Sequence, residues 1–268
     1  MIEVRKEGVL LSRTDLEFEN EGVLNPAAYR DGESVHILYR AVQKGNLSTI
    51  GYCKLDGPLT LVERWEKPFM VPEFDYESQG IEDPRIVKID DLFYLTYTAY
   101  DGENALGALA TSKDLWHFEK KGIIVPSITY SEFVKLVEAT GKVKESYYRD
   151  QKFYHFNSNP EKILLWDKNV IFFPRRINGK LAFLHRIRPG IQIVMVDSID
   201  ELTHDFWTNY FLHLSDHIVL EPVYKHESQY AGGGCPPIET EKGWLLIYHG
   251  AEETDKGIVY SACAAALM

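Results

Sequence analysis

The sequence has few cysteines, no long apolar run and no apolar signal segment. Its three cysteines are too far apart for the spacing of a zinc site or a disulfide framework. No stretch is apolar for long enough to span a bilayer, and the first residues lack the apolar core of a signal peptide. We therefore expect a cytoplasmic protein whose thiols are reduced: Cys53, Cys235 and Cys263.

Basic residues are also scarce relative to acidic ones. The chain has 29 Lys and Arg against 40 Asp and Glu, which gives a net charge of −11. This excess argues against nucleic acid or an anionic membrane as a partner, and it makes any local basic cluster informative. Aromatic residues are plentiful, with 16 Tyr and 5 Trp, and an aromatic-rich cleft suits a sugar.

One pattern occurs four times: a proline, a few strand residues, a tight turn, and then an apolar or aromatic strand. The prolines are Pro26, Pro84, Pro174 and Pro237. Asp-Gly and Asn-Gly turns between apolar strands favour type I′ hairpins, so each copy predicts a β-hairpin. A strand follows each hairpin, at 48–53, 107–112, 191–196 and 259–263.

Repeated antiparallel sheets with little helix are typical of a β-propeller. A β-sandwich is the main alternative, but it does not predict the self-similarity. We expect a single all-β domain over residues 1–268. An insertion at about 127–159 lengthens the interval before the third copy, and residues 130–140 within it have helical spacing.

Two adjacent carboxylates, Glu82 and Asp83, precede the proline of the second copy. Proline restricts the residue before it, so we expect Asp83 to be extended, at a strand entrance. An isolated motif of this kind would be a surface turn, with Glu82 solvated and Asp83 paired to Arg85. The repeat favours a functional interpretation, because equivalent strand ends of a propeller converge on one face.

The polar residues that end the hairpins should therefore surround a shared pocket. Glycosyl transfer suits a mixture of acids and bases there, because an acid must protonate the glycosidic oxygen, and Asp83 is the candidate. Arginine forks and a histidine could hold phosphate as the nucleophile. The converging residues are Asn25, Arg40, Asp83, Asp101, Arg176, Arg186 and His249, and the possible phosphate ligands are Arg175, Arg176, Arg186, Arg188 and His249.

In combination these motifs resemble glycoside hydrolase family 130, the β-mannoside phosphorylases and related β-mannosidases. The resemblance covers nearly the whole chain and implies a five-bladed β-propeller. The fifth blade would be absent here, so we expect a truncated form. The matching segments are 25–26, 38–41, 80–85, 97–102, 172–180, 184–186, 234–237 and 244–250.

The resemblance implies that Asp83 is the general acid, with protonation relayed through a hydroxyl of the bound mannose. The family's hydrolases replace basic phosphate ligands with glutamates, so basic residues at these positions favour phosphorolysis. We expect an inverting β-mannoside phosphorylase that forms α-mannose 1-phosphate, with inorganic phosphate as co-substrate and no cofactor or metal. The implied mannose-binding residues are Asn25, Arg40 and Asp101, and the implied phosphate-binding residues are Arg176, Arg186 and His249.

Two alternatives stay open at this point. One is a β-mannosidase of the same family that uses water. The other is a non-catalytic propeller that binds carbohydrate. The expected partners are a β-mannoside oligosaccharide and phosphate, without nucleic acid or membrane, and a homo-oligomer is compatible with the sequence.

Overall fold

The computed structural model describes residues 4–147 and 163–267. The chain divides into two compact units, Met1–Pro84 and Arg85–Met268. Strands dominate both units. None of the helices in the described ranges is long and apolar enough to cross a membrane.

The first unit is built on one antiparallel sheet. Its strands pair in chain order: β1 (Gly22–Asp31), β2 (Ser34–Val42), β3 (Ser48–Asp56) and β4 (Thr60–Arg64). Two short 3-10 helices flank the sheet, η1 (Glu17–Glu19) and η2 (Asp75–Glu77). One face of the sheet buries an apolar cluster that includes Phe18, Ile37, Tyr39, Cys53 and Leu55.

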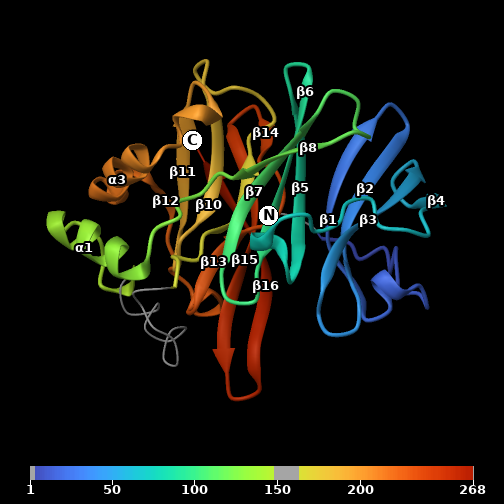
Figure 1. Cartoon of the computed structure of the whole chain (residues 1–268), viewed down its shortest axis with the longest axis horizontal. Helices are drawn as coiled ribbons and strands as arrows, with labels where there is room; N and C mark the ends of the chain where they lie inside the picture. Colours follow the sequence, from blue (N-terminus) through green and yellow to red (C-terminus); the bar gives the residue numbers. More distant parts are fainter. Residues whose placement is uncertain (1–3, 148–162, 268) are drawn as a thin grey trace. The chain divides into compact units, whose positions relative to one another are not determined.

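Three further antiparallel sheets follow, and the first of them is joined to the β1–β4 sheet by one parallel bridge between β3 and β5 (Gly80–Ile89), so that the two form one eight-stranded sheet. In this first one, β5, which begins before the division between the units, continues into β6 (Leu92–Tyr100), β7 (Ala105–Ser112) and β8 (Glu119–Ile123). The next has β9 (Lys168–Phe172), β10 (Leu181–Arg186), β11 (Ile191–Val196) and β12 (Ile218–Leu220) in order. In the last, β15 (Gly243–Thr254) pairs with β13 (Tyr230–Gly233), β14 (Ile238–Thr240) and β16 (Gly257–Leu267), and β15 and β16 make a long hairpin (Figure 1).

Three of the predicted hairpins and all four of the strands that follow the hairpins are present. In the third copy, by contrast, the residues after Pro174 form only an isolated bridge, and β10 pairs with β9, before the proline. The strands after the hairpins are β3, β7, β11 and β16. The Asn178-Gly179 turn has φ values of 50° and 81°, the positive pair that a type I′ turn requires. In the other copies only one turn residue, Gly32 or Asp90, or the glycine that starts the next strand, Gly243, has a positive φ.

Two helices pack together beside the β9–β12 sheet (Figure 1). The helix α1 (Tyr130–Thr140) has the predicted bounds, and a capping box starts it, because Thr129 Oγ1 accepts from Glu132 N and the Glu132 carboxylate accepts from Thr129 N. The helix α3 (His204–Leu212) was not predicted. The Phe133 and Phe211 rings meet edge to face, 5.2 Å apart, in the largest apolar cluster of this unit.

Shorter helical turns complete the second unit: η3 (Ile199–Glu201), η4 (Leu214–His217) and η5 (Lys225–Glu227). Residues 148–162 lie outside the described residues, and they include the last part of the predicted insertion at about 127–159. The insertion and the single domain over residues 1–268 stay predictions.

Candidate functional site

A polar group of the first unit, which we call the carboxylate cluster, consists of Asn25, Arg40, Glu82 and Asp83. Both carboxylates contact the guanidinium of Arg40. Arg40 Nη2 lies 2.7 Å from Glu82 Oε1, and Arg40 Nη1 lies 3.5 Å from Asp83 Oδ1. Asn25 Nδ2 donates to the same Asp83 oxygen at 2.7 Å. The side chains of Arg40, Glu82 and Asp83 are only 13%, 8% and 11% exposed, so little solvent screens these contacts.

A close approach of two strands builds this cluster. β5 meets β3 in a single parallel bridge between Gly80 and Ser48. Gly80 has φ of 136°, and a Cβ there would lie 2.7 Å from Ser48 N, so the approach requires glycine. Ser48 Oγ also accepts from Arg40 Nε at 2.9 Å. The bridge thus brings Glu82 and Asp83 to the guanidinium of Arg40.

The expectation of an extended Asp83 is wrong. Asp83 has φ of 51°, and Asn25, which precedes the proline of the first copy, has φ of 45°. Asn and Asp are the non-glycine residues that tolerate this left-handed region best. The register of β1 against β2 shifts between Leu24 and Ala27, so Asn25 lies in a bulge, and bulge geometry together with the Asn25–Asp83 bond outweighs the local preference set by proline.

Glu82 is the member of the cluster that sequence reasoning missed. The surface-turn interpretation would leave it solvated and the functional interpretation gives it no role, whereas the residue is 6% exposed and binds Arg40. In a regular strand, neighbouring side chains point to opposite faces. The left-handed backbone at Asp83 breaks that alternation, which lets both acids reach the same guanidinium.

A second group, in the other unit, is the basic cluster: Arg186, Arg188, Tyr230 and His249. The guanidinium carbons of Arg186 and Arg188 lie 4.5 Å and 3.8 Å from the centre of the Tyr230 ring. A Cβ placed on Gly232 would lie 2.6 Å from His249 Nε2 and 2.9 Å from Arg186 Nη1. The arginine and the histidine therefore converge over a glycine that leaves room for both.

The cationic surroundings act on Tyr230. Burial alone would raise the pKa of its hydroxyl, but the nearby charge of Arg186, a hydrogen bond with Tyr260 and the charges of Arg188 and Lys168 together lower that pKa below its usual value. The Tyr230 and Tyr260 hydroxyl oxygens are 2.9 Å apart. A group of arginines, a histidine and tyrosine hydroxyls can donate several hydrogen bonds to an oxyanion.

The structure does not bring Arg176 to this cluster. Arg176 Nε donates to Asp90 at 3.1 Å, and its Nη1 donates to the carbonyl oxygens of Gly179 and Asp197. These contacts lie where β10 begins, whereas Arg186 lies where it ends, roughly 16 Å away along the strand. Arg176 instead lines a separate cavity of about 700 Å³.

Arg175 also lies apart from the basic cluster. It forms an ion pair with Glu239, and both side chains are more than half exposed. Its guanidinium carbon lies 5.1 Å from the centre of the Trp244 ring. Such an exposed pair contributes little to binding or stability.

Asp101 organises the turn between β6 and β7. Its Oδ1 accepts from the main-chain N–H groups of Glu103 and Asn104, at 2.8 Å and 2.6 Å, and its Oδ2 accepts from Asn104 Nδ2 at 3.0 Å. Burial opposes the charge, but these hydrogen bonds outweigh burial and lower the pKa of the carboxyl group. Asp101 is therefore held as a carboxylate at the end of β6.

Each of three sheets is preceded by a buried glutamate, a feature that sequence reasoning also missed. Glu19, Glu77 and Glu227 each end a 3-10 helix and are 0–1% exposed. Each is the sixth residue before a special position: Asn25, Asp83 and Gly233, respectively. The recurring Glu-Ser-Gln of 77–79 and 227–229 was the available signal.

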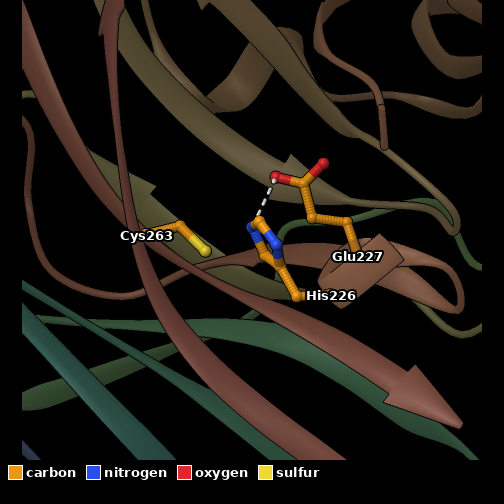
Figure 2. A group of neighbouring side chains, drawn as sticks. All are labelled: His226, Glu227 and Cys263. Atoms are coloured by element: carbon orange, nitrogen blue, oxygen red, sulfur yellow. Dashed lines mark ion pairs between the residues drawn. The ribbon is translucent and has the colours of Figure 1, made fainter. Parts of the chain in front are cut away.

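His226, Glu227 and Cys263 are the one group among the described residues with enough nearby donor atoms to consider a metal ion (Figure 2). His226 Nε2 lies 3.8 Å from Glu227 Oε1. The Glu227 carboxylate already accepts from the N–H groups of Val223 and Tyr224 and from the Tyr248 hydroxyl. Glu77 accepts the same pair of main-chain bonds in the first unit, so Glu227 is better explained as a structural element than as a metal ligand.

Comparison with known proteins identifies the family. Residues 13–268 match the glycoside hydrolase family 130 profile, which is described as beta-1,4-mannooligosaccharide phosphorylase. The chain belongs to glycoside hydrolase family 130. A 1,2-beta-oligomannan phosphorylase of Thermoanaerobacter sp. (strain X514) is 31% identical over 258 residues, which is 92% of this chain and 70% of that protein.

Two further relatives of this family 130 chain come from Listeria innocua. The beta-1,2-mannobiose phosphorylase of that organism is 31% identical over 202 residues, covering 74% of this chain and 44% of the relative. The solved structure of a beta-1,2-mannobiose phosphorylase from Listeria innocua in complex with beta-1,2-mannobiose aligns with a TM-score of 0.61 at 23% identity. That alignment covers 92% of this chain and 72% of the solved one, and it supports the fold.

Proposed function

We propose that this protein is an inverting β-mannoside phosphorylase that transfers mannose to inorganic phosphate and releases the acceptor. The observation that carries the proposal is the convergence of Arg186 and His249 over Gly232, beside Arg188 and Tyr230. A hydrolase has no need of such a concentration of cationic donors, because water is neutral. Phosphate needs it, since its oxygens are best held by arginine forks.

The carboxylate cluster supplies the acid in this proposal. The bond between the mannose C1 and the glycosidic oxygen breaks, and that oxygen takes a proton that originates on Asp83 and passes through a mannose hydroxyl. A phosphate oxygen attacks C1 from the opposite face, so the β-linked sugar becomes α-mannose 1-phosphate. Asn25 and Arg40 hold the Asp83 carboxylate in a fixed orientation and present their remaining donors to the sugar.

The residue roles follow from this division. Asp83 is proposed as the acid, Asn25, Arg40 and Asp101 as sugar-binding residues, and Arg186 and His249 as phosphate ligands. Arg176 is left out of the proposed phosphate ligands because it lies at the other end of β10.

We further propose that the four sheets are blades of a five-bladed β-propeller. The support is their common plan, a hairpin with a third antiparallel strand, and the likeness to solved family 130 structures. The proposed location is the cytoplasm, because Cys53, Cys235 and Cys263 are free thiols.

The test is an assay of phosphate dependence on β-1,2-linked mannobiose, β-1,4-linked mannobiose and β-1,4-mannosylglucose. We expect mannose 1-phosphate to form in proportion to phosphate until saturation. Release of free mannose at a rate that phosphate does not change would instead identify a β-mannosidase. Binding of these sugars without turnover would identify a non-catalytic carbohydrate-binding protein.

A further inference from the structure

Three buried side chains form a chain of hydrogen bonds: Asp167, His185 and Tyr210. His185 directly precedes Arg186 of the basic cluster in the sequence. His185 Nδ1 lies 2.7 Å from Asp167 Oδ2, and His185 Nε2 lies 2.8 Å from the Tyr210 hydroxyl oxygen. The three residues are 0–2% exposed. They come from three separate elements, namely the segment before β9, the strand β10 and the helix α3.

The hydrogen-bond direction at Tyr210 fixes a proton on His185 Nε2. The Tyr210 hydroxyl donates its single proton to the carbonyl oxygen of Ile193 at 3.0 Å. It must therefore accept from His185 Nε2, which carries a proton. The proton of the contact between His185 Nδ1 and Asp167 lies between these two groups, so the buried pair carries no net charge.

The alternative proton arrangement satisfies fewer contacts. A neutral His185 that accepts the Tyr210 proton at Nε2 would leave the 3.0 Å contact between Tyr210 and the Ile193 carbonyl without a proton. It would also leave a net negative charge in the core, which is costly without a partner. The other ionisable groups nearby on α3 and η4 are those of His213, Asp216 and His217, and the His217 ring stacks on Tyr210 at 4.1 Å.

This chain ties down the end of the strand that presents Arg186. The register of β10 against β9 shifts between Leu184 and Arg186, so the bond between His185 and Asp167 spans an irregularity in the ladder. Arg186 pairs with Lys168, the residue after Asp167. Asp167 is itself fixed through its main chain, because its carbonyl oxygen accepts from Gly107 N at 2.8 Å and its N–H donates to Ala105 O at 3.3 Å.

We propose that His185, held between Asp167 and Tyr210, is a positioning residue for phosphate binding that fixes the end of β10 and so aims Arg186. This inference rests on the proposed function, in which Arg186 is a phosphate ligand. Bulges beside functional sites commonly redirect a side chain, and here the buried pair holds the bulge in one geometry.

The test compares two tyrosine variants that each remove one buried hydroxyl bonded to a histidine. Tyr210→Phe removes the partner of His185 Nε2, and the matched control Tyr52→Phe removes the hydroxyl 2.9 Å from His36 Nδ1 in the first unit. We expect Tyr210→Phe to raise the KM for phosphate about tenfold and to leave the KM for mannoside within about twofold. Tyr52→Phe should change neither value. A folded Tyr210→Phe enzyme with an unchanged KM for phosphate, or with both KM values raised equally, would overturn the positioning role.

Two measurements do not depend on turnover. The ¹⁵N resonances of His185 should show a proton on Nε2 at about pH 7.5, and an unprotonated Nε2 would overturn the assignment even if Tyr210→Phe did not fold. Calorimetric titration with inorganic phosphate should show the same weakening in Tyr210→Phe. If the wild type binds phosphate but forms no mannose 1-phosphate, the proposed function fails while the positioning of Arg186 is still supported or refuted by this titration.

Discussion

Substitution of Gly232 by alanine tests the basic cluster directly. The added Cβ would lie 2.6 Å from His249 Nε2 and 2.9 Å from Arg186 Nη1. Ordinary carbon contacts are at least 3.4 Å, so both side chains must retreat by roughly half an ångström to one ångström. A shift of that size is enough to disturb a bound anion, because oriented hydrogen bonds in active sites tolerate little displacement.

The magnitude follows from the bonds that the two side chains are proposed to donate. A hydrogen bond to a charged group contributes about 1.5–3 kcal/mol, and loss of one such bond corresponds to roughly a tenfold to hundredfold weaker binding. We therefore expect Gly232→Ala to raise the KM for phosphate by about tenfold or more. The KM for mannoside should stay within about twofold, since the atoms nearest the added Cβ belong to His249 and Arg186 and to none of the proposed sugar-binding residues.

The assay is phosphorolysis with phosphate and mannoside varied in turn, and thermal unfolding monitors the fold. Gly22→Ala is the matched control, because the nearest atom to a Cβ there is 4.0 Å away and the backbone is not left-handed. The reasoning about the basic cluster is refuted if Gly232→Ala keeps the wild-type KM for phosphate in a folded enzyme. It is also refuted if Gly22→Ala produces the same rise.

Three further predictions address single residues. Asp83→Asn should abolish phosphorolysis and keep mannoside binding, because the amide oxygen still accepts from Asn25; turnover above about 1% of wild type would contradict its role as the acid. Arg186→Ala should raise the KM for phosphate at least tenfold while Arg176→Ala changes it less than twofold, and equal effects in the kinetic assay would restore Arg176 as a ligand. Although burial opposes it, Arg186 keeps the pKa of Tyr230 below 10.0, so the phenolate forms and offsets cationic charge as the pH rises towards that lowered value. The KM for phosphate should therefore rise on the alkaline side in wild type and stay flatter in Tyr230→Phe, and identical pH profiles would contradict this effect.

The parts of the fold that local chemistry decides were predictable. Asn178-Gly179 specifies a turn through two positive φ values, and Thr129 with Glu132 starts α1 through reciprocal bonds. Neither feature needs distant contacts. The helix α3 was missed although Thr203 caps its first turn, because its aromatic residues Phe206, Trp207, Tyr210 and Phe211 have no clear polar face.

The site was harder to predict because it depends on which end of a strand a residue occupies. Arg176 and Arg186 flank the same strand and have the same charge, so the sequence pattern treats them alike. The length of β10 separates them, because Arg176 precedes the strand and Arg186 is its last residue. The hairpin pattern itself could have distinguished the two arginines. In a hairpin, the end of the second strand lies beside the start of the first strand, so Arg186 is expected beside the start of β9 and Arg176 near the turn between β9 and β10.

The same position of the repeat carries a polar side chain in the first two copies, Asn25 and Asp83, and a glycine in the last. In the first two copies the backbone at this position is left-handed. A non-glycine residue in this region costs of the order of 1–3 kcal/mol and persists only where the surroundings fix it. The bulge in β1 and the close contact between Gly80 and Ser48 fix the backbone here. This backbone brings the Asn25 amide and the Asp83 carboxylate into hydrogen-bonding distance. In the last sheet the sixth residue after the buried glutamate is Gly233, next to Gly232, so the same place in the repeat carries no polar side chain. A Cβ on Gly233 would clash with Ile171 Cδ1, whereas the neighbouring Gly232 leaves room for Arg186 and His249. A side chain at Gly232 would therefore displace the two proposed phosphate ligands.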